Sequence, residues 1–373
     1  MKNVIIMTAA VIALLTTENC TLASYAYRDV GVASYNRIGA ARGANVTIGN
    51  GTAPLPSSRH PSRKIICLNG DVIEVQMVAG PPRSTNTITG SQIPRILNSE
   101  GGHKCVKFVY ISKNVWMIGA RCFSEFNSLI AVTFERVSQL TRIEAQAFRK
   151  CPSLKSICIP ANVESLGFRC FNECTSLGVV TFEPDSRVKE IGDETFHGCS
   201  ALALVCIPTN VKRLGKGCFI GASSLCDVTF GPNSQVKEIG DETFYGCSAL
   251  ALVCIPTNVK RLGRLCFADC SSLRSICIPE NVERLGNRCF IGASSLCDVT
   301  FGPNSQVEKI GYETFHGCSA LALVCIPTNV KRLGRLCFAD CSSLRSICIP
   351  ENVRLERDVF PAGITVEHYP TEH

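Results

Sequence analysis

A phenylalanine that returns at a nearly fixed interval limits what this chain of 373 residues can fold into. Successive copies lie 22 to 25 residues apart, and most steps are 23 or 25. These residues are Phe123, Phe148, Phe171, Phe196, Phe219, Phe244, Phe267, Phe290, Phe315, Phe338 and Phe360. A short period of this kind indicates a solenoid, in which each repeat contacts only its neighbours in the stack.

A longer duplication lies on top of the short period. Residues 236–282 return at 307–353, an offset of 71 residues that holds repeats of 23, 23 and 25. The two copies differ at Lys237/Glu308, Glu238/Lys309, Asp241/Tyr312 and Tyr245/His316. Such near identity indicates recent expansion by unequal copying. We therefore expect that removal of residues 215–285 leaves a folded, shorter solenoid.

Each repeat also carries a short segment of alternating apolar residues, for example Ile157-Cys158-Ile159. On a β-strand this alternation turns both isoleucines inward and Cys158 outward. One such strand cannot bury its apolar side alone, so stacked copies predict a parallel sheet over one continuous core. Pro160 ends the strand because it cannot donate to the ladder. Gly167 permits the bend before the convex-side turn.

The full repeat text, I-P-x-N-V-x-x-L-G-x-x-C-F-x-x-C-x-S-L, stands at 159–177 and, with Ala293 at the second Cys position, at 278–296. This text resembles the BspA-like (Treponema pallidum-type) leucine-rich repeat family over about residues 106–366. The resemblance implies an α/β repeat solenoid. Its expected form is an arc with a parallel β-sheet on the concave face and short irregular or helical turns on the convex face.

Members of that family are typically secreted or displayed at the cell surface, and several act as adhesins for host proteins or other cells. The family shares no catalytic site. The resemblance therefore implies a secreted or cell-surface protein that binds other proteins without catalysis. Its expected partner is a protein, with host and extracellular matrix proteins as candidates, and the chain is expected to be a monomer.

The chain divides into five segments on this interpretation. They are a signal peptide at 1–23, a flexible segment at 24–60, an N-terminal cap at 61–105, a solenoid of about 11 repeats at 106–366 and a tail at 367–373. The apolar run of 12 residues from Val4 to Leu15 is too short to cross a membrane, which needs a helix of about 20 residues. Lys2 precedes it and Ala23 offers a cleavage site, which predicts export. An uncleaved anchor is the alternative.

The two ends of the solenoid are predicted from local patterns. Residues 64–78 read as a β-hairpin with its turn at Asn69-Gly70, which would cover the first rung. Residues 81–102 read as a loop, and Val106, Val109 and Ile111 then match the strand positions of the first repeat. At the other end, Ile364 and Val366 are expected to supply the final strand.

Two cysteine columns surround the repeated phenylalanine. One lies directly before it and alternates with Ala or Thr, and the other lies three residues after it and alternates with Ala. Replacement by Ala indicates a small buried position, where free Cys behaves as a small apolar residue. Pairs such as Cys170/Cys174 have a spacing that zinc uses, but no His recurs beside them. We interpret both columns as core and expect no metal or cofactor.

The outward strand positions form the candidate binding face. They carry small, thiol and aliphatic side chains, with two isolated acidic groups, and suit a broad protein contact. No aromatic platform or arginine cluster lies among them, which argues against a nucleic-acid groove. The face comprises Ser156, Cys158, Val179, Thr181, Leu204, Cys206, Asp227, Thr229, Leu252, Cys254, Ser275, Cys277, Asp298, Thr300, Leu323, Cys325, Ser346 and Cys348.

The outward cysteines conflict with the export prediction, because unpaired thiols are unusual in oxidising compartments. Cys254 and Cys277 lie on adjacent rungs, as do Cys325 and Cys348. Their spacing of about 4.8 Å is within disulfide range, but parallel side chains make the torsion unfavourable. Two alternatives follow. One is an intracellular or periplasmic interaction scaffold with reduced cysteines, and the other is a redox or metal protein.

Charged residues form a column just before each L-G or I-G step and contribute to the net charge of +7. Its members are Glu190, Arg213, Glu238, Arg261, Arg284, Lys309 and Arg332. Where the signs alternate, we expect exposed ion pairs between rungs that solvate the stack and fix its register. The stretch from Arg261 to Arg332 breaks this alternation and leaves a polyanion-binding patch open as an alternative.

No enzyme is expected. The six histidines are His60, His103, His197, His316, His368 and His373. His197 and His316 stand where another repeat has Tyr245, which indicates surface variation and not a general base. The sequence has no glycine-rich phosphate loop and no paired carboxylates in a predicted pocket, so no small-molecule substrate is expected.

Overall fold

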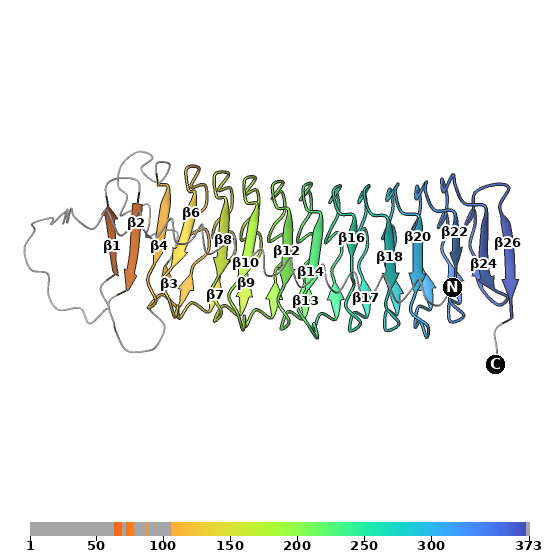
Figure 1. Ribbon diagram of the computed structural model, residues 1–373, viewed down its shortest axis with the longest axis horizontal. Helices are drawn as coiled ribbons and strands as arrows, with labels where there is room; N and C mark the ends of the chain where they lie inside the picture. The colour runs from red at the N-terminus through yellow and green to blue at the C-terminus, as the bar shows by residue number, and fades with distance from the viewer. Residues whose placement is uncertain (1–62, 69–71, 78–86, 89–105, 371–373) are drawn as a thin grey trace, which may run out of the picture.

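The computed structural model describes residues 63–68, 72–77, 87–88 and 106–370. Two rows of β-strands run along an elongated stack (Figure 1). Each turn of the solenoid contributes one strand of up to five residues to the first row and one strand of two residues to the second. The sequence prediction of a parallel-strand repeat solenoid is confirmed. The predicted signal peptide, the segment 24–60 and the Asn69-Gly70 turn lie outside the described residues.

The first row forms what we name the long-strand face. Its strands are β4 (Phe108–Ile111), β6 (Ala131–Phe134), β8 (Ser156–Ile159), β10 (Val179–Phe182), β12 (Leu204–Ile207), β14 (Asp227–Phe230), β16 (Leu252–Val253), β18 (Ser275–Ile278), β20 (Asp298–Phe301), β22 (Leu323–Cys325), β24 (Ser346–Pro350) and β26 (Thr365–Tyr369). Hydrogen-bonded pairing is interrupted between β16 and β18 and between β20 and β22. Within each part the strands are parallel and in register, as in the pairing of Thr181 with Cys158.

The second row is one continuous 12-stranded parallel sheet. We name its outer side the short-strand face. Its strands are β3 (Thr87–Ile88), β5 (Met117–Ile118), β7 (Arg142–Ile143), β9 (Ser165–Leu166), β11 (Glu190–Ile191), β13 (Arg213–Leu214), β15 (Glu238–Ile239), β17 (Arg261–Leu262), β19 (Arg284–Leu285), β21 (Lys309–Ile310), β23 (Arg332–Leu333) and β25 (Arg354–Leu355). From β5 to β23 the first residue of each strand points outward and the second is buried, because side chains alternate along a strand.

The N-terminal end of the stack contains the predicted strand pair. Strand β1 (Arg63–Leu68) pairs antiparallel with β2 (Val72–Met77), and β2 then pairs with β4 of the first full rung. The prediction of a loop over 81–102 is wrong at Thr87 and Ile88, which form β3 and pair with β5. This two-residue strand was missed because it lacks the flanking Phe and Cys of the repeat.

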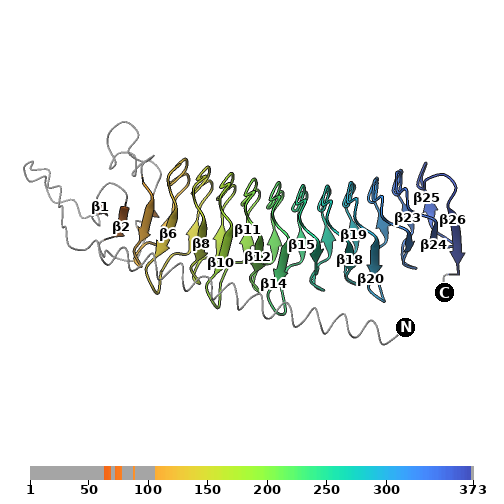
Figure 2. The same cartoon turned by 45° about the horizontal axis from the view of Figure 1, so that its top comes forward.

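A ladder of phenylalanine rings fills the core between the two rows. From Phe123 to Phe338 each ring stacks on the next with centroids 5.2 to 5.5 Å apart. The outermost pair, Phe338 and Phe360, is looser at 6.0 Å. The rings from Phe123 to Phe338 are fully buried. Figure 2 shows the consequence, a series of rungs stacked along one axis from the hairpin to β26.

The two inner cysteine columns are buried, as predicted. The column three residues after Phe also bonds between rungs: the thiol of Cys174 donates to the carbonyl of Phe148 at 3.1 Å. In the other column, Thr195 replaces Cys and its hydroxyl donates to the carbonyl of Gly192 at 2.7 Å. Cys, Thr and Ala can therefore exchange in these columns because all three are small, and the thiol of Cys174 and the hydroxyl of Thr195 find acceptors within the stack.

The prediction of helical turns is wrong, because no helix occurs in the described residues. In the turns from Phe123 to Phe338, the residues two before and two after the phenylalanine adopt positive φ, as at Arg169 (53°) and Glu173 (59°). A left-handed residue cannot continue a right-handed helix. The N–H groups of Arg169, Phe171 and Glu173 instead donate to the next rung, to the carbonyls of Asp193, Thr195 and His197. The fold is thus a β-solenoid on all sides and not an α/β one.

The C-terminal end extends one strand beyond the last complete repeat. Strand β26 pairs with β24 in parallel, and Ile364 and Val366 pack against the core as predicted. The predicted tail at 367–373 begins too early, because Glu367 to Tyr369 belong to β26. Tyr369 also donates its hydroxyl to the carbonyl of Ile326, which fixes this strand against the stack.

Candidate functional site

The predicted binding residues occupy outward positions on the long-strand face. Their burial alternates with that of the core residues between them, as in the half-buried, buried, half-buried, buried pattern of β8. The exposed members are Val179, Leu204, Leu252, Cys254, Cys277, Asp298, Thr300, Leu323 and Cys325, and the half-buried members are Ser156, Cys158, Thr181, Cys206, Asp227, Thr229, Ser275, Ser346 and Cys348. The strand alternation therefore places all of them on one side of the stack.

A hollow of about 780 Å³ opens on this face over strands β8, β10, β12 and β14. Six predicted residues line it: Cys158, Thr181, Leu204, Cys206, Asp227 and Thr229. The other twelve predicted residues do not line it. The hollow thus occupies the part of the long-strand face between β8 and β14.

The loops that follow the strands supply the remaining wall of the hollow, and sequence reasoning missed them. They contribute Glu183 to Ser186 after β10, Pro208 to Asn210 after β12, and Gly231 after β14. The signal was present in the repeat lengths. The 25-residue repeats carry two extra residues after the strand, in E-P-D-S and G-P-N-S, and these extend the loops beside the strands.

The polar groups of the hollow are few and partly desolvated. Burial raises the pKa of Asp227 above its usual value. In register, Asp227 lies between Leu204 and Leu252 on the neighbouring strands. The hydroxyl oxygen of Thr181 is buried and has no hydrogen-bond partner among the described residues. Since an unpaired buried polar group is costly, the Thr181 hydroxyl is suited to bind a partner that supplies a donor or acceptor, and the partly desolvated Asp227 carboxyl lies in the same hollow.

Apolar side chains form the exposed part of the same region. Val179 is 39% exposed and Leu204 is 37% exposed, on adjacent strands. Leu252 and Leu323 occupy the same strand position at 42% and 53% exposure, with Asp227, Ser275 and Asp298 at that position on the strands between them. A recessed site with an apolar column and few polar groups is typical of a protein or peptide contact.

Thiols accompany the hollow but do not form a metal centre in the described part of the chain. All 21 cysteines described there are free thiols. No cluster of three or more His, Cys, Asp or Glu side chains with metal-binding geometry occurs among residues 106–370 or in the shorter described strands. Sequence reasoning missed two exposed thiols, Cys226 and Cys297, which directly precede β14 and β20. Cys226 lines the hollow.

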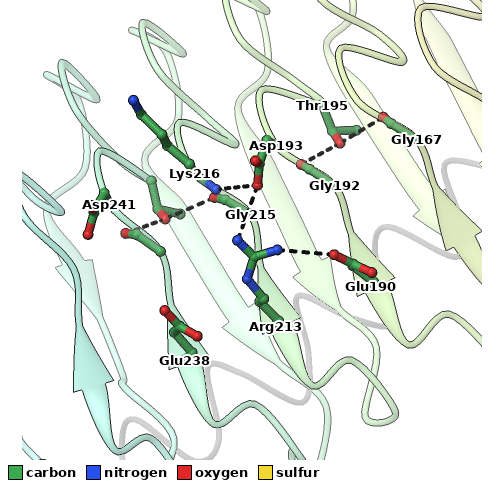
Figure 3. A network of polar contacts seen from close by, with 12 residues as sticks. Gly167, Glu190, Gly192, Asp193, Thr195, Arg213, Gly215, Lys216, Glu238 and Asp241 are labelled. Carbon is green, nitrogen blue, oxygen red and sulfur yellow. Dashed lines mark hydrogen bonds and ion pairs between the residues drawn. The ribbon is translucent and has the colours of Figure 1, made fainter.

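The opposite, short-strand face carries ion pairs between rungs. Figure 3 shows Arg213 donating to Glu190 at 3.1 Å and to Asp193 at 3.4 Å. Asp193 also accepts the backbone N–H of Lys216 at 2.8 Å. Arg261 repeats this arrangement with Glu238 and Asp241. The prediction of inter-rung ion pairs is confirmed here, and these pairs fix the register of neighbouring turns.

The chain matches a family model described as "BspA type Leucine rich repeat region (6 copies)". The matches cover residues 102–226, 189–318 and 260–362. They overlap and together include the whole set of full repeats. A comparison with curated proteins found no match. Within the described residues, no helix has the length and apolar character needed to cross a membrane.

Solved structures match this chain at low sequence identity. The pneumococcal vaccine antigen PcpA is 20% identical, with 82% of this chain and 86% of that chain covered and a TM-score of 0.51. A leucine-rich cell surface protein from Faecalibacterium prausnitzii is 20% identical, with 85% and 95% covered and a TM-score of 0.43. The T. pallidum leucine-rich repeat protein is 18% identical, with 71% and 90% covered and a TM-score of 0.35. The likeness to PcpA shows that the two chains share a fold.

Proposed function

This chain belongs to the BspA-type leucine-rich repeat family, and we propose that it is an exported or cell-surface protein that binds another protein, adhesin-like and without catalysis. The binding site is the hollow on the long-strand face together with the exposed apolar column beside it. The expected partner is a host or extracellular matrix protein. Surface display is included in the proposal because a protein of the same fold is described as a vaccine antigen.

One observation carries the choice of this face. The hollow combines exposed Leu204, desolvated Asp227 and unpaired Thr181 in one recess. Protein interfaces draw most of their affinity from a few desolvated groups surrounded by contacts that exclude water. The recess supplies such groups, whereas the remainder of the long-strand face supplies a wider contact area.

The experiment compares two substitutions of the same kind in the same column. Leu204→Glu places a charge in the hollow, and Leu323→Glu places one outside it at a more exposed position. We expect Leu204→Glu to weaken binding to immobilised extracellular matrix proteins by about tenfold or more, as for an interface hot spot. Leu323→Glu should change it little. Equal effects of both substitutions, or none, would reject the hollow as the binding site.

The exposed thiols favour a second candidate, an intracellular or periplasmic interaction scaffold with reduced cysteines. Cys226, Cys254, Cys277, Cys297 and Cys325 are exposed. Counting reactive thiols on protein taken directly from cells separates the two candidates. Export into an oxidising compartment predicts that these positions are blocked or oxidised, whereas an internal scaffold predicts that they react with a maleimide.

A further inference from the structure

The C-terminal half of the short-strand face carries an uninterrupted row of cations. Its members are Arg261, Arg284, Lys309, Arg332 and Arg354, which we name the cation row. Each is the outward residue of its strand, and each pairs in register with the next. With rungs about 4.8 Å apart, the row is roughly 19 Å long. Like charges in line repel one another, and only Arg261 and Arg332 have carboxylate partners, so an anion bound along the row would relieve the remaining repulsion.

Strands β11, β13 and β15 of the same sheet show the alternative. There the equivalent position alternates in sign, through Glu190, Arg213 and Glu238. Arg213 and Arg261 each form two ion pairs with carboxylates of the preceding rung. The fold therefore neutralises this column by itself wherever acidic residues are available. The cation row is a departure from an arrangement that the same chain uses elsewhere.

The duplication locates the origin of this departure. Three of the four differences between residues 236–282 and 307–353 lie on this face. Lys237-Glu238 becomes Glu308-Lys309, which exchanges an acid for a base in the column and leaves the net charge unchanged. Asp241 becomes Tyr312, which removes the second carboxylate. These changes convert a column of alternating charge into an uninterrupted column of cations.

Most of the cation row is left unpaired by the protein. Among the described residues, the side chains of Arg284, Lys309 and Arg354 form no hydrogen bond or ion pair. Arg332, which has lost both partners that Arg261 retains, pairs with Glu356 instead. The guanidinium groups are exposed and retain their planar donor forks. Such forks bind sulfate, carboxylate or phosphate with two parallel hydrogen bonds.

We infer that the cation row binds a linear acidic polysaccharide, whose sulfate or carboxylate groups follow one another along the row. This is a second binding surface, on the other side of the solenoid from the hollow. The row is one residue wide and straight, which suits a narrow polymer. No aromatic side chain stands in the row itself, and the neighbouring ring of Tyr312 is covered by the Arg288 guanidinium, 5.1 Å from its centroid, so nucleic-acid bases have no continuous stacking platform. An anionic membrane is a broad surface and would also contact the exposed carboxylates of Glu283 and Glu308, which flank the row and would repel it. A narrow polymer can follow the row between them.

The test uses a substitution that leaves composition and net charge unchanged. The double variant Glu308→Lys/Lys309→Glu restores the first copy's order and places an acid between Arg284 and Arg332. Its fold is expected to be retained, because residues 237–238 already have this order in the same fold. The probe is immobilised heparin, and the readout is equilibrium binding of the full chain at increasing sodium chloride. We expect the exchange to weaken binding about fivefold or more, since one attractive contact is lost and a repulsive one is added.

The reciprocal variant Lys237→Glu/Glu238→Lys supplies the matched control. It joins Arg213 to the cation row through a lysine at 238 and should strengthen heparin binding, again at constant net charge. Binding of the native chain should fall with salt, because exposed charges are screened within about 10 Å at 0.1 M. Opposite effects of the two exchanges would show that the position of the charge, and not its total, decides binding.

Two results would overturn the inference. One is equal heparin binding by the native chain and both variants. The other is stronger binding, with the same sensitivity to the exchange, to oligo-dT or to phosphatidylserine vesicles. The Leu204→Glu variant separates this inference from the proposed function, because it should impair protein binding and leave heparin binding unchanged.

Discussion

The rings of Phe219 and Phe244 stack with their centroids 5.4 Å apart and their planes within 2°. Similar pairs run the length of the solenoid, so each ring is packed between two others. Removal of one ring therefore disturbs both neighbouring rungs. The stability of the solenoid depends on this ladder because each turn contacts only its neighbours.

Phe244→Ala should lower the free energy of unfolding by about 3–5 kcal/mol, the usual cost of deleting a buried phenyl group. The adjacent Tyr245→His is the control. Tyr245 is 38% exposed, and the equivalent residue of the second copy is His316. Urea denaturation followed by circular dichroism measures both. A loss below about 1 kcal/mol for Phe244→Ala would contradict a tightly packed ladder.

Most rungs carry glycine four residues before the repeated phenylalanine, where neighbouring rungs come into close contact. A Cβ atom on Gly263 would lie 2.4 Å from the backbone nitrogen of Asp241. Gly263→Ala should therefore destabilise the chain by several times more than Gly178→Ala, where the nearest atom would be 3.5 Å away. Thermal unfolding of the two variants measures the difference. Equal melting temperatures would show that the rungs can separate at little cost.

The buried thiols predict a loss of stability in alkali. Burial raises the pKa of Cys247 from 9.0 to about 12. Above pH 9 the unfolded chain releases this proton while the folded chain keeps it, so stability falls as the pH rises toward 12. Cys247→Ala should reduce this slope by up to about 1.4 kcal/mol per pH unit. Ala222 and Ala293 occupy the equivalent positions, so the variant should fold. An unchanged slope would contradict the assignment.

The sequence duplication predicts that one complete unit can be removed. Deletion of residues 215–285 joins Leu214 to Gly286 and recreates the Leu285-Gly286 junction of the native chain. The product should keep the circular dichroism spectrum of the native chain and a cooperative unfolding transition, with a shorter hydrodynamic length. A molten or aggregated product would mean that the repeat boundaries are misplaced.

The sequence predicted the architecture well because the repeat states it many times. The alternation in Ile157-Cys158-Ile159 predicted which side chains face the core, and all strands of this type obey it. Helical turns were predicted wrongly because positive φ at Arg169 and Glu173 leaves no trace in residue type. Glycine occupies the equivalent position only in some repeats, as at Gly198 and Gly217.

The candidate site was predicted in part. Strand alternation identified Thr181, Leu204 and Asp227 as outward residues, and the hollow contains all three. It did not locate the hollow, because the walls come from loops whose positions depend on how successive turns stack. Repeat length was the available signal, since the residues of E-P-D-S after β10 extend one of these loops.

The proposed extracellular location of the solenoid is tested on intact cells that produce the protein. External protease is added, and the chain is then analysed by mass spectrometry for its mature N-terminus and surviving fragments. If the solenoid lies outside the cell, we expect removal of a leader near Ala23 and digestion of the solenoid by the external protease. An unprocessed N-terminus with a fully protected solenoid would contradict it and would favour a reduced internal scaffold.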